Sequence, residues 1–499
     1  MTDLDVAVTP QPPPSEPYPY GKRYPWIAMG VVLLGTFMVI LDTTIVNVAL
    51  PQIGIALGNS SGIEWIVTAY LLAVGLAQPP TGWLADRYGR KKVFIVSLVL
   101  FGVGSLLAAL SPTLEILVVT RVIQGLGGGA LAPVGMAMAY ELFPTDRRGS
   151  ALGIWGVAAM AAPAFGPVIG GYVVTTVSWH WLFLINVPVC ILAVVLAVRL
   201  LRDTGYREAR RFDGVGLGLI SVVLVSWLIA FAQASEWGWG STPIITLLVS
   251  GAVLLVFFVL WERRVEHPAI DPAMFRVRIF SLTLVVVGAA IIVQYSILVF
   301  LPLQLETLRG LSALRVGTML VPMALAAAIT FPLGGRLTDR IGPRYPVIAG
   351  TLLLGTSAWI LGHLALDAPT SAVVAAVFVQ GLGFGFAMMP NAVTGLNALP
   401  MRYVASATAI RQLGQRVSAS FGVAVLATVL ATRLADVAPK DTAGAQSAYQ
   451  TVFLCAAALA VVATVLAVFL PGRQRNRELL SERSTEMAQS RLDAPVDVA

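Results

Sequence analysis

One charged stretch decides the fold: Gly82-Trp-Leu-Ala-Asp86-Arg87-Tyr-Gly89-Arg90-Lys-Lys-Val. Its five charges separate two apolar runs, each of which is long enough to cross a bilayer. The glycines permit a tight turn, and the basic cluster favours the cytoplasmic side of a membrane. The stretch therefore predicts a short cytoplasmic connection between two membrane-spanning helices.

A weaker copy of this stretch occurs downstream, as Gly335-Arg-Leu-Thr-Asp339-Arg-Ile-Gly342. Its glycines and its aspartate each lie 253 positions after their counterparts in the first copy. A second match pairs Gln124-Gly-Leu-Gly-Gly-Gly with Gln380-Gly-Leu-Gly-Phe-Gly. These matches indicate that the chain consists of two related halves. Membrane proteins built from such repeats hold their substrate between the halves, near the membrane midplane. The charged loops either only anchor the chain with its positive charges inside or gate the cytoplasmic face, and the gating residues would be Gly82, Asp86, Arg87, Gly89, Arg90, Asp339 and Arg340.

Composition places the chain in a membrane. Of its 499 residues, 57% are hydrophobic and only 12% are charged, whereas soluble proteins have about 25% charged residues. The mean hydropathy is +0.82. A net charge of +7 is compatible with nucleic-acid binding, but the basic residues lie in short loops rather than on an amphipathic face. We expect no nucleic-acid partner.

Enzymatic and cofactor chemistry is not indicated. The two cysteines, Cys190 and Cys455, lie far apart inside apolar runs and suggest neither a disulfide framework nor a metal site. No phosphate-binding Gly-x-x-x-x-Gly-Lys-Ser/Thr segment and no nucleophile constellation occurs. We expect a protein that is not an enzyme, with no cofactor, no metal and no ATP-driven step.

Fourteen apolar runs of about 20 residues can be counted between polar breaks. If both termini are cytoplasmic, most of the 33 lysines and arginines fall on the inside, which favours that orientation. The predicted fold is an all-α, multi-pass protein of the cell membrane, with two six-helix bundles and two extra helices between them. The predicted boundaries are a disordered tail over 1–25, bundles over 26–201 and 279–470, linkers plus the extra helices over 202–278, and a cytoplasmic tail over 471–499.

Charged side chains inside a span are rare and cost about 2.5 to 3.5 kcal/mol each, so each one is a candidate functional residue. The first span contains Asp42, followed by Asn47. Asp42 is either a group that binds a proton or a cationic substrate, or a solvated residue at the outer boundary. The fourth span contains Arg121 and Gln124 on one helical face. Arginine does not release its proton, so Arg121 would either tune a nearby carboxylate or form a structural ion pair.

The fifth span combines small residues with two prolines four positions apart. Prolines bend a helix, and a Gly-x-x-x-Gly seam lets a neighbouring helix approach closely. The pattern predicts a bent, tightly packed helix, and its residues are Pro163, Gly166, Pro167, Gly170 and Gly171.

The first loop resembles the signature loop of the major facilitator superfamily of secondary transporters. The segments in spans one, four and five are similar to motifs of its drug:proton antiporters with fourteen helices, and the resemblance covers roughly residues 26–470. It implies that Arg121 takes part in proton coupling and that the fifth span belongs to an exporter.

Two further segments resemble that group. Trp179-His180-Trp-Leu-Phe-Leu-Ile-Asn186 is similar to a segment in which an arginine stands at the position of His180. Arg411-Gln412-Leu-Gly resembles an Arg-Gln-x-Gly segment, and we expect it to line the cytoplasmic side of the cavity.

Glu306 lies near the end of the ninth span, where relatives tend to have glutamine. It is either a second protonation site or a solvated helix end paired with Arg309.

The function predicted from these features is proton-coupled antiport by alternating access. The protein would export amphipathic or cationic drugs and other organic compounds; the alternative is a dedicated exporter of an endogenous lipid or antibiotic-like metabolite. We expect a monomer whose partners are small molecules, protons and the bilayer. The proton-coupling residues would be Asp42, Arg121 and Glu306, and the substrate cavity would include Asn47, Gln124, Asn186, Arg411 and Gln412.

Overall fold

The computed structural model describes residues 23–58, 62–144, 147–202, 213–266, 268–400, 403–438, 441–476 and 478. All the regular elements within these ranges are helices. They are α1 (Tyr24–Ala56), α2 (Trp65–Ala77), α3 (Thr81–Tyr88), α4 (Arg90–Ala109), α5 (Leu114–Leu142), α6 (Arg148–Thr176), α7 (His180–Leu184), α8 (Asn186–Leu200), α9 (Gly214–Trp237), α10 (Thr242–Glu262), α11 (Ala273–Arg276), α12 (Arg278–Arg309), α13 (Ala313–Ile341), α14 (Arg344–His363), α15 (Thr370–Asn397), α16 (Val404–Ala435) and α17 (Thr442–Ala467).

Twelve spans in the described part of the chain are long and apolar enough to cross a membrane. These spans confirm the prediction of an all-helical, multi-pass membrane protein. The number fourteen is not established by them, because α2 has only 13 residues and α6 is not among the twelve. Of the predicted tails, residues 1–22 and 479–499 lie outside the described residues.

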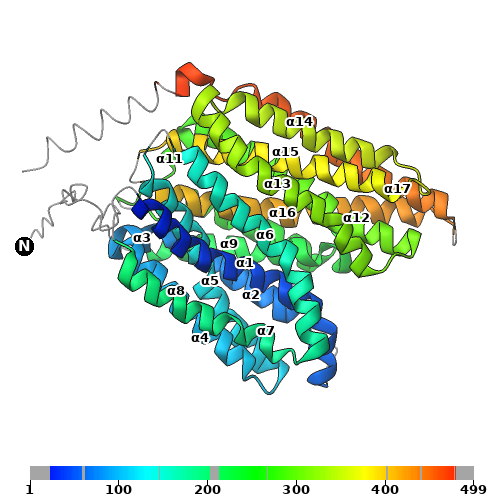
Figure 1. The fold of residues 1–499 in the computed structure, drawn as a ribbon, viewed down its shortest axis with the longest axis horizontal. Helices are drawn as coiled ribbons and strands as arrows, with labels where there is room; N and C mark the ends of the chain where they lie inside the picture. The colour runs from blue at the N-terminus through cyan, green and yellow to red at the C-terminus, as the bar shows by residue number, and fades with distance from the viewer. Residues whose placement is uncertain are drawn as a thin grey trace, which may run out of the picture.

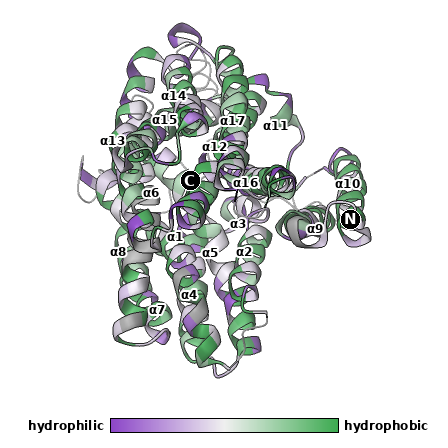
Figure 2. Cartoon of the chain, turned by 90° about the vertical axis from the view of Figure 1, so that its right-hand side faces the viewer, coloured by the Kyte–Doolittle hydropathy of each residue, from purple (hydrophilic) through white to green (hydrophobic). Residues whose placement is uncertain are grey.

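The helices form two groups that follow one another along the chain. In Figure 1, α1 to α5, α7 and α8 occupy the lower part of the molecule, while α12 to α15 and α17 occupy the upper part. Figure 2, which looks along the helices, shows α6 and α16 between these groups and α9 with α10 at one side. The contacts agree with this view, since α6 packs on α13 and α9 packs on α16. Each group therefore contributes one long helix to the boundary between them.

The repeated Gln-Gly-Leu-Gly segment explains how each group packs. A Cβ on Gly127 of α5 would lie 2.8 Å from the carbonyl oxygen of Ser97 in α4. A Cβ on Gly383 of α15 would likewise lie 2.8 Å from the carbonyl oxygen of Gly350 in α14. Only glycine permits such approach of two backbones. The internal repeat read from the sequence is thus present as matching α4–α5 and α14–α15 packing.

Candidate functional site

The centre of the candidate site is an ion pair buried inside the first group of helices. Nη1 of Arg121 on α5 donates to Oδ2 of Asp42 on α1 at 2.5 Å, and both side chains are 0% exposed. Asp42 is the nineteenth residue of α1, about 27 Å along a helix that rises 1.5 Å per residue. Because its carboxylate is fully buried among other helices, Asp42 is not solvated in this structure.

Neutral side chains complete the coordination of the carboxylate. Oδ1 of Asp42 accepts hydrogen bonds from Nε2 of Gln124 at 2.9 Å and from Nδ2 of Asn186 at 3.0 Å. Both amides also donate to Oγ of Ser105, which donates in turn to a backbone carbonyl. We call Asp42, Ser105, Arg121, Gln124 and Asn186 the Asp42 cluster. Four helices contribute to it: α1, α4, α5 and α8.

The guanidinium of Arg121 makes further contacts with α2. Its Nε donates to the carbonyl of Ile66 at 3.1 Å, and its Cζ lies 3.9 Å from the ring centroid of Tyr70. Cation–π contacts of this kind gain strength where water is excluded. Arg121 is thereby held beside the carboxylate by α2 as well as by α5.

This arrangement can change when a proton arrives. An ionised carboxylate only accepts hydrogen bonds, whereas a protonated one must donate through one oxygen. Asp42 accepts from three donors, two at Oδ1 and one at Oδ2, so a proton would bind at Oδ2, beside Arg121. Protonation would remove the negative charge that Arg121 pairs with.

The sequence predicted four residues of this site: Asp42, Arg121, Gln124 and Asn186. It did not predict Ser105 and Tyr70, which contact them. Ser105 and Tyr70 are fully buried and uncharged. Neither stands out in an apolar run, and only the spatial arrangement reveals them.

Four predicted site residues lie apart from the Asp42 cluster: Asn47, Glu306, and Arg411 with Gln412 on α16. Asn47 is exposed, five positions further along α1. Glu306 is exposed near the end of α12, and the guanidinium of Arg309 donates to the carbonyls of Ala365 and Ala368. The structure places Glu306 on an accessible surface rather than in the interior network.

The corresponding region of the second group is neutral. Nε2 of Gln380 on α15 donates to Oε1 of Gln294 on α12 at 3.1 Å, and both side chains are buried. Where the first group pairs an arginine with a carboxylate, the second joins two amides. The two repeats therefore differ in charge at their centres.

The first charged loop forms a tight turn between α3 and α4. Gly89 has a φ of 88°, a backbone conformation that favours glycine. Asp86 and Arg90 are almost fully buried, and Arg90 forms an ion pair with Glu141 at the end of α5. Arg87 is exposed. We call the end of the molecule that carries this turn the Gly89 face; it lies at the left of Figure 1.

The two groups meet at the Gly89 face. A Cβ on Gly82 of α3 would lie 2.9 Å from Cα of Ser406 on α16. Opposite this contact, Gly149 of α6 packs directly on Gly335 of α13. The loop residues Gly82 and Gly335 thus both sit in contacts that join the two groups.

Asp339 receives hydrogen bonds across the same boundary. Its carboxylate accepts from the backbone N–H of Gly149 at 3.1 Å, and from the N–H and the hydroxyl of Ser150, both at 3.2 Å. These groups open α6, where the helix dipole favours a negative charge. Arg340, the next residue, is exposed.

The fifth predicted span, α6, packs on α1 through its glycines. A Cβ on Gly166 would lie 2.6 Å from Cβ of Thr44, and one on Gly170 would lie 2.9 Å from the carbonyl of Ile45. Gly171 is half-buried. The side chains of Pro163 and Pro167 lie outside the described part of the structure. The predicted close seam is present, and it joins α6 to the helix that carries Asp42.

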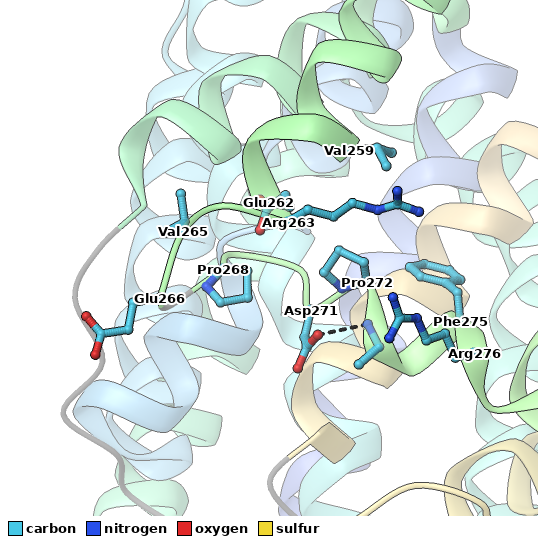
Figure 3. Close-up of a pocket in the computed structure, with 11 residues that line it drawn as sticks. Val259, Glu262, Arg263, Val265, Glu266, Pro268, Asp271, Pro272, Phe275 and Arg276 are labelled. Atoms are coloured by element: carbon cyan, nitrogen blue, oxygen red, sulfur yellow. Dashed lines mark hydrogen bonds between the residues drawn. The ribbon is translucent and has the colours of Figure 1, made fainter.

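A cavity of about 600 Å³ lies elsewhere, after the end of α10. Asp271 accepts from the backbone N–H of Ala273 at 2.8 Å, as Figure 3 shows, and from the hydroxyl of Tyr403 at 2.5 Å. None of the site residues predicted from the sequence lines this cavity. Its lining is Val259, Glu262, Arg263, Val265, Glu266, Pro268, Asp271, Pro272, Ala273, Phe275 and Arg276.

The family model described as the Major Facilitator Superfamily matches residues 32–213 and 212–423. The chain belongs to this superfamily. It is a membrane transporter by family, and its many apolar helices indicate a multi-pass membrane protein.

Relatives of this transporter include proteins of drug efflux and resistance. It is 31% identical over 406 residues to the Multidrug export protein EmrB of Escherichia coli, covering 80% of this chain and 79% of the relative. It is 30% identical over 399 residues to the Lincomycin resistance protein LmrB of Listeria monocytogenes, covering 80% and 85%. Among solved structures, the human organic anion transporter MFSD10 shares the fold with a TM-score of 0.62 at 15% identity, covering 89% and 99%.

Proposed function

We propose that this transporter exports amphipathic organic compounds in exchange for protons by alternating access, in a cell membrane and with both termini in the cytoplasm. The observation that carries the proposal is the buried Asp42–Arg121 pair, a carboxylate inside a span whose partner competes with a proton. The relatives named for multidrug export and lincomycin resistance support the direction and the class of substrate.

We further propose that fourteen spans are present. The two beyond the twelve apolar helices would be α6, with 29 residues, and α2 continued by α3 after a bend at 78–80. Two six-helix bundles, over 26–201 and 279–470, would then flank α9 and α10. Such a unit carries its own site between the halves, which fits a monomer.

Proton exchange can be tested in inside-out vesicles whose lumen is acidified by respiration. Addition of a substrate should alkalinise the lumen, because each compound that enters exchanges for protons. A panel of ethidium, lincomycin and 1-pyrenebutyrate covers a bulky cation, an antibiotic named in a relative, and an anion. The pH change and the accumulation of the compound should both vanish with a protonophore. If no compound produced protonophore-sensitive accumulation, drug:proton antiport would be ruled out for this panel and the metabolite exporter would take its place.

The contacts at the Gly89 face would form the cytoplasmic gate. Asp339 caps α6 across the boundary and Gly82 packs on Ser406, so this face is closed in the structure. Opening it would break the three hydrogen bonds to Asp339 and separate both glycine contacts. The gate would be asymmetric, because Asp339 bonds across the boundary while Arg90 pairs within its own group.

Replacement of Asp339 by alanine should open this gate more often, since the first turn of α6 loses its bonds to α13. In a background without Cys190 and Cys455, a cysteine at Ser406 should react with a membrane-impermeant maleimide about five- to tenfold faster in Asp339→Ala, given about 1 to 1.4 kcal/mol for the lost contacts. The exposed carboxylate Asp367 supplies the control, Asp367→Ala. Equal labelling rates in the two variants would contradict the assignment of Asp339 to the gate.

A further inference from the structure

Two arginines inside the second group have no role in the proton exchange proposed above: Arg411 and Arg416, both on α16. Arg411 is buried, and its Nη2 donates to the backbone carbonyl of Met388 at 3.2 Å. Arg416 is half-buried, and no hydrogen bond or ion pair joins it to any other described residue. Neither guanidinium faces a carboxylate within the described ranges. Two positive charges in a span thus stand without a partner of opposite charge.

The acidic side chains near the interior are already engaged or lie elsewhere. Asp42 is held by Arg121, and Glu141 is paired with Arg90. Glu306 is exposed near the end of α12. Charges inside a membrane are costly unless something compensates them, and a pair of uncompensated arginines on one helix points to a ligand that supplies the missing charge.

The position of Arg416 is suited to contact a transported molecule. α16 lies at the boundary between the two groups, where the hydroxyl of Thr408 donates to the carbonyl of Pro133 at 3.1 Å. Residues 414–420 are all only partly buried although the helix is flanked by both groups. Tyr70 of α2 and Tyr295 of α12 both act electrostatically on the guanidinium of Arg416. Its charge is therefore felt by one tyrosine from each half of the molecule.

The same tyrosine connects Arg416 to the proton site. The ring of Tyr70 stacks against the guanidinium of Arg121, which holds Asp42. Tyr70 thus acts on the charge of Arg416 and also holds Arg121.

We propose that Arg416 binds the anionic group of the substrate, so that the compounds exported are amphipathic organic anions such as carboxylates and sulfonates. The proposal rests on the proposed export function and narrows its substrate class. The planar guanidinium offers paired N–H donors that match a carboxylate or sulfonate, and the bond gains from the charge on both partners. Organic cations, which the sequence alone suggested as substrates, would be repelled by two uncompensated positive charges.

Two probes that share an apolar body and differ in charge test this directly: 1-pyrenebutyrate, an anion, and 1-pyrenebutyltrimethylammonium, a cation. Equilibrium binding is measured on the full chain in nanodiscs of phosphatidylcholine, with the signal of empty nanodiscs subtracted. We expect the anion to bind at least about tenfold more tightly than the cation. Arg416→Gln should weaken binding of the anion about tenfold and change that of the cation by less than about twofold.

The matched control is Arg433→Gln, which removes an exposed arginine from the last turn of the same helix and should change neither affinity. Arg416→Lys retains the charge and should preserve the preference for the anion. It keeps the test decisive if the glutamine variant fails to fold. Equal binding of the two probes, or equal loss of anion binding in Arg416→Gln and Arg433→Gln, would overturn the proposal.

Efflux of the two probes from vesicles separates this proposal from the function it rests on. Arginine-dependent binding of the anion without proton-driven efflux would sustain the anion site and refute export. Proton-driven efflux of the cation without binding of the anion would sustain export and refute the anion site.

Discussion

Asp42→Asn is expected to abolish proton-driven efflux while leaving the chain in the membrane. Asparagine keeps the size of the side chain but cannot take up and release a proton. The change also leaves Arg121 buried without its counter-charge, and breaking such a pair costs about 3 to 5 kcal/mol. We expect efflux to fall by about 100-fold or more, measured with the best-transported compound of the vesicle panel.

A double variant separates loss of the proton site from loss of stability. Asp42→Asn with Arg121→Gln removes both charges, so its thermal unfolding temperature should recover towards that of the unmodified chain. Efflux should not recover, because no titratable carboxylate remains in the Asp42 cluster. Asp367→Asn is the matched control, since it removes an exposed carboxylate with no role in the site, and efflux should stay within about twofold. Proton-driven efflux by the double variant would show that Asp42 is not the proton site.

The second large effect is expected from Gly127→Ala, a change of one methyl group. The added Cβ would lie 2.8 Å from the carbonyl of Ser97 and closer still to the backbone N–H of Phe101. Both neighbours are backbone atoms, so α4 and α5 must move apart along their whole contact. Overpacking costs typically 1 to 3 kcal/mol and occasionally more, and we expect about 3 kcal/mol here because no side chain can turn away.

Gly30→Ala is the control for Gly127→Ala. Gly30 also lies within a helix, but a Cβ there meets nothing within 4 Å. Helix propensity favours alanine by about 1 kcal/mol at either position, so it predicts stabilisation in both variants. Thermal unfolding of the purified proteins, followed by fluorescence, should show a lower midpoint for Gly127→Ala alone. An unchanged midpoint would mean that α4 and α5 do not approach as closely as the structure has them.

More of the fold than of the site could be predicted from the sequence. Apolar runs and charged loops indicate which segments enter a membrane, and the two copies of the Gly-Leu-Gly segment reveal the repeat. α2 shows the limit: its apolar helix ends after 13 residues and continues as α3, because the chain bends at 78–80. Counting apolar runs by hydropathy does not detect such a bend.

The Asp42 cluster shows what the sequence leaves undetermined. Asp42 and Arg121 stand out because charges are rare in spans, yet they lie 79 positions apart and nothing in the order of residues pairs them. Ser105 and Tyr70 belong to the same network only because the fold places them beside Asp42 and Arg121. Glu306 and Asn47 carry the right functional groups, but the direction in which a helix presents a side chain depends on its neighbours, and both are exposed.

A proton site with a single carboxylate limits how steep a gradient the transporter can build. If Asp42 carries one proton per cycle, a neutral substrate gains about 2.3 kcal/mol from a potential of 100 mV, which sustains roughly a 50-fold gradient. A monoanion leaving a negative interior doubles the transferred charge, to about 4.6 kcal/mol and roughly a 2,000-fold gradient. A monocation moves no net charge against one proton, and only the pH difference would drive it. The lone carboxylate of the Asp42 cluster and the two arginines of α16 would then favour the same kind of cargo.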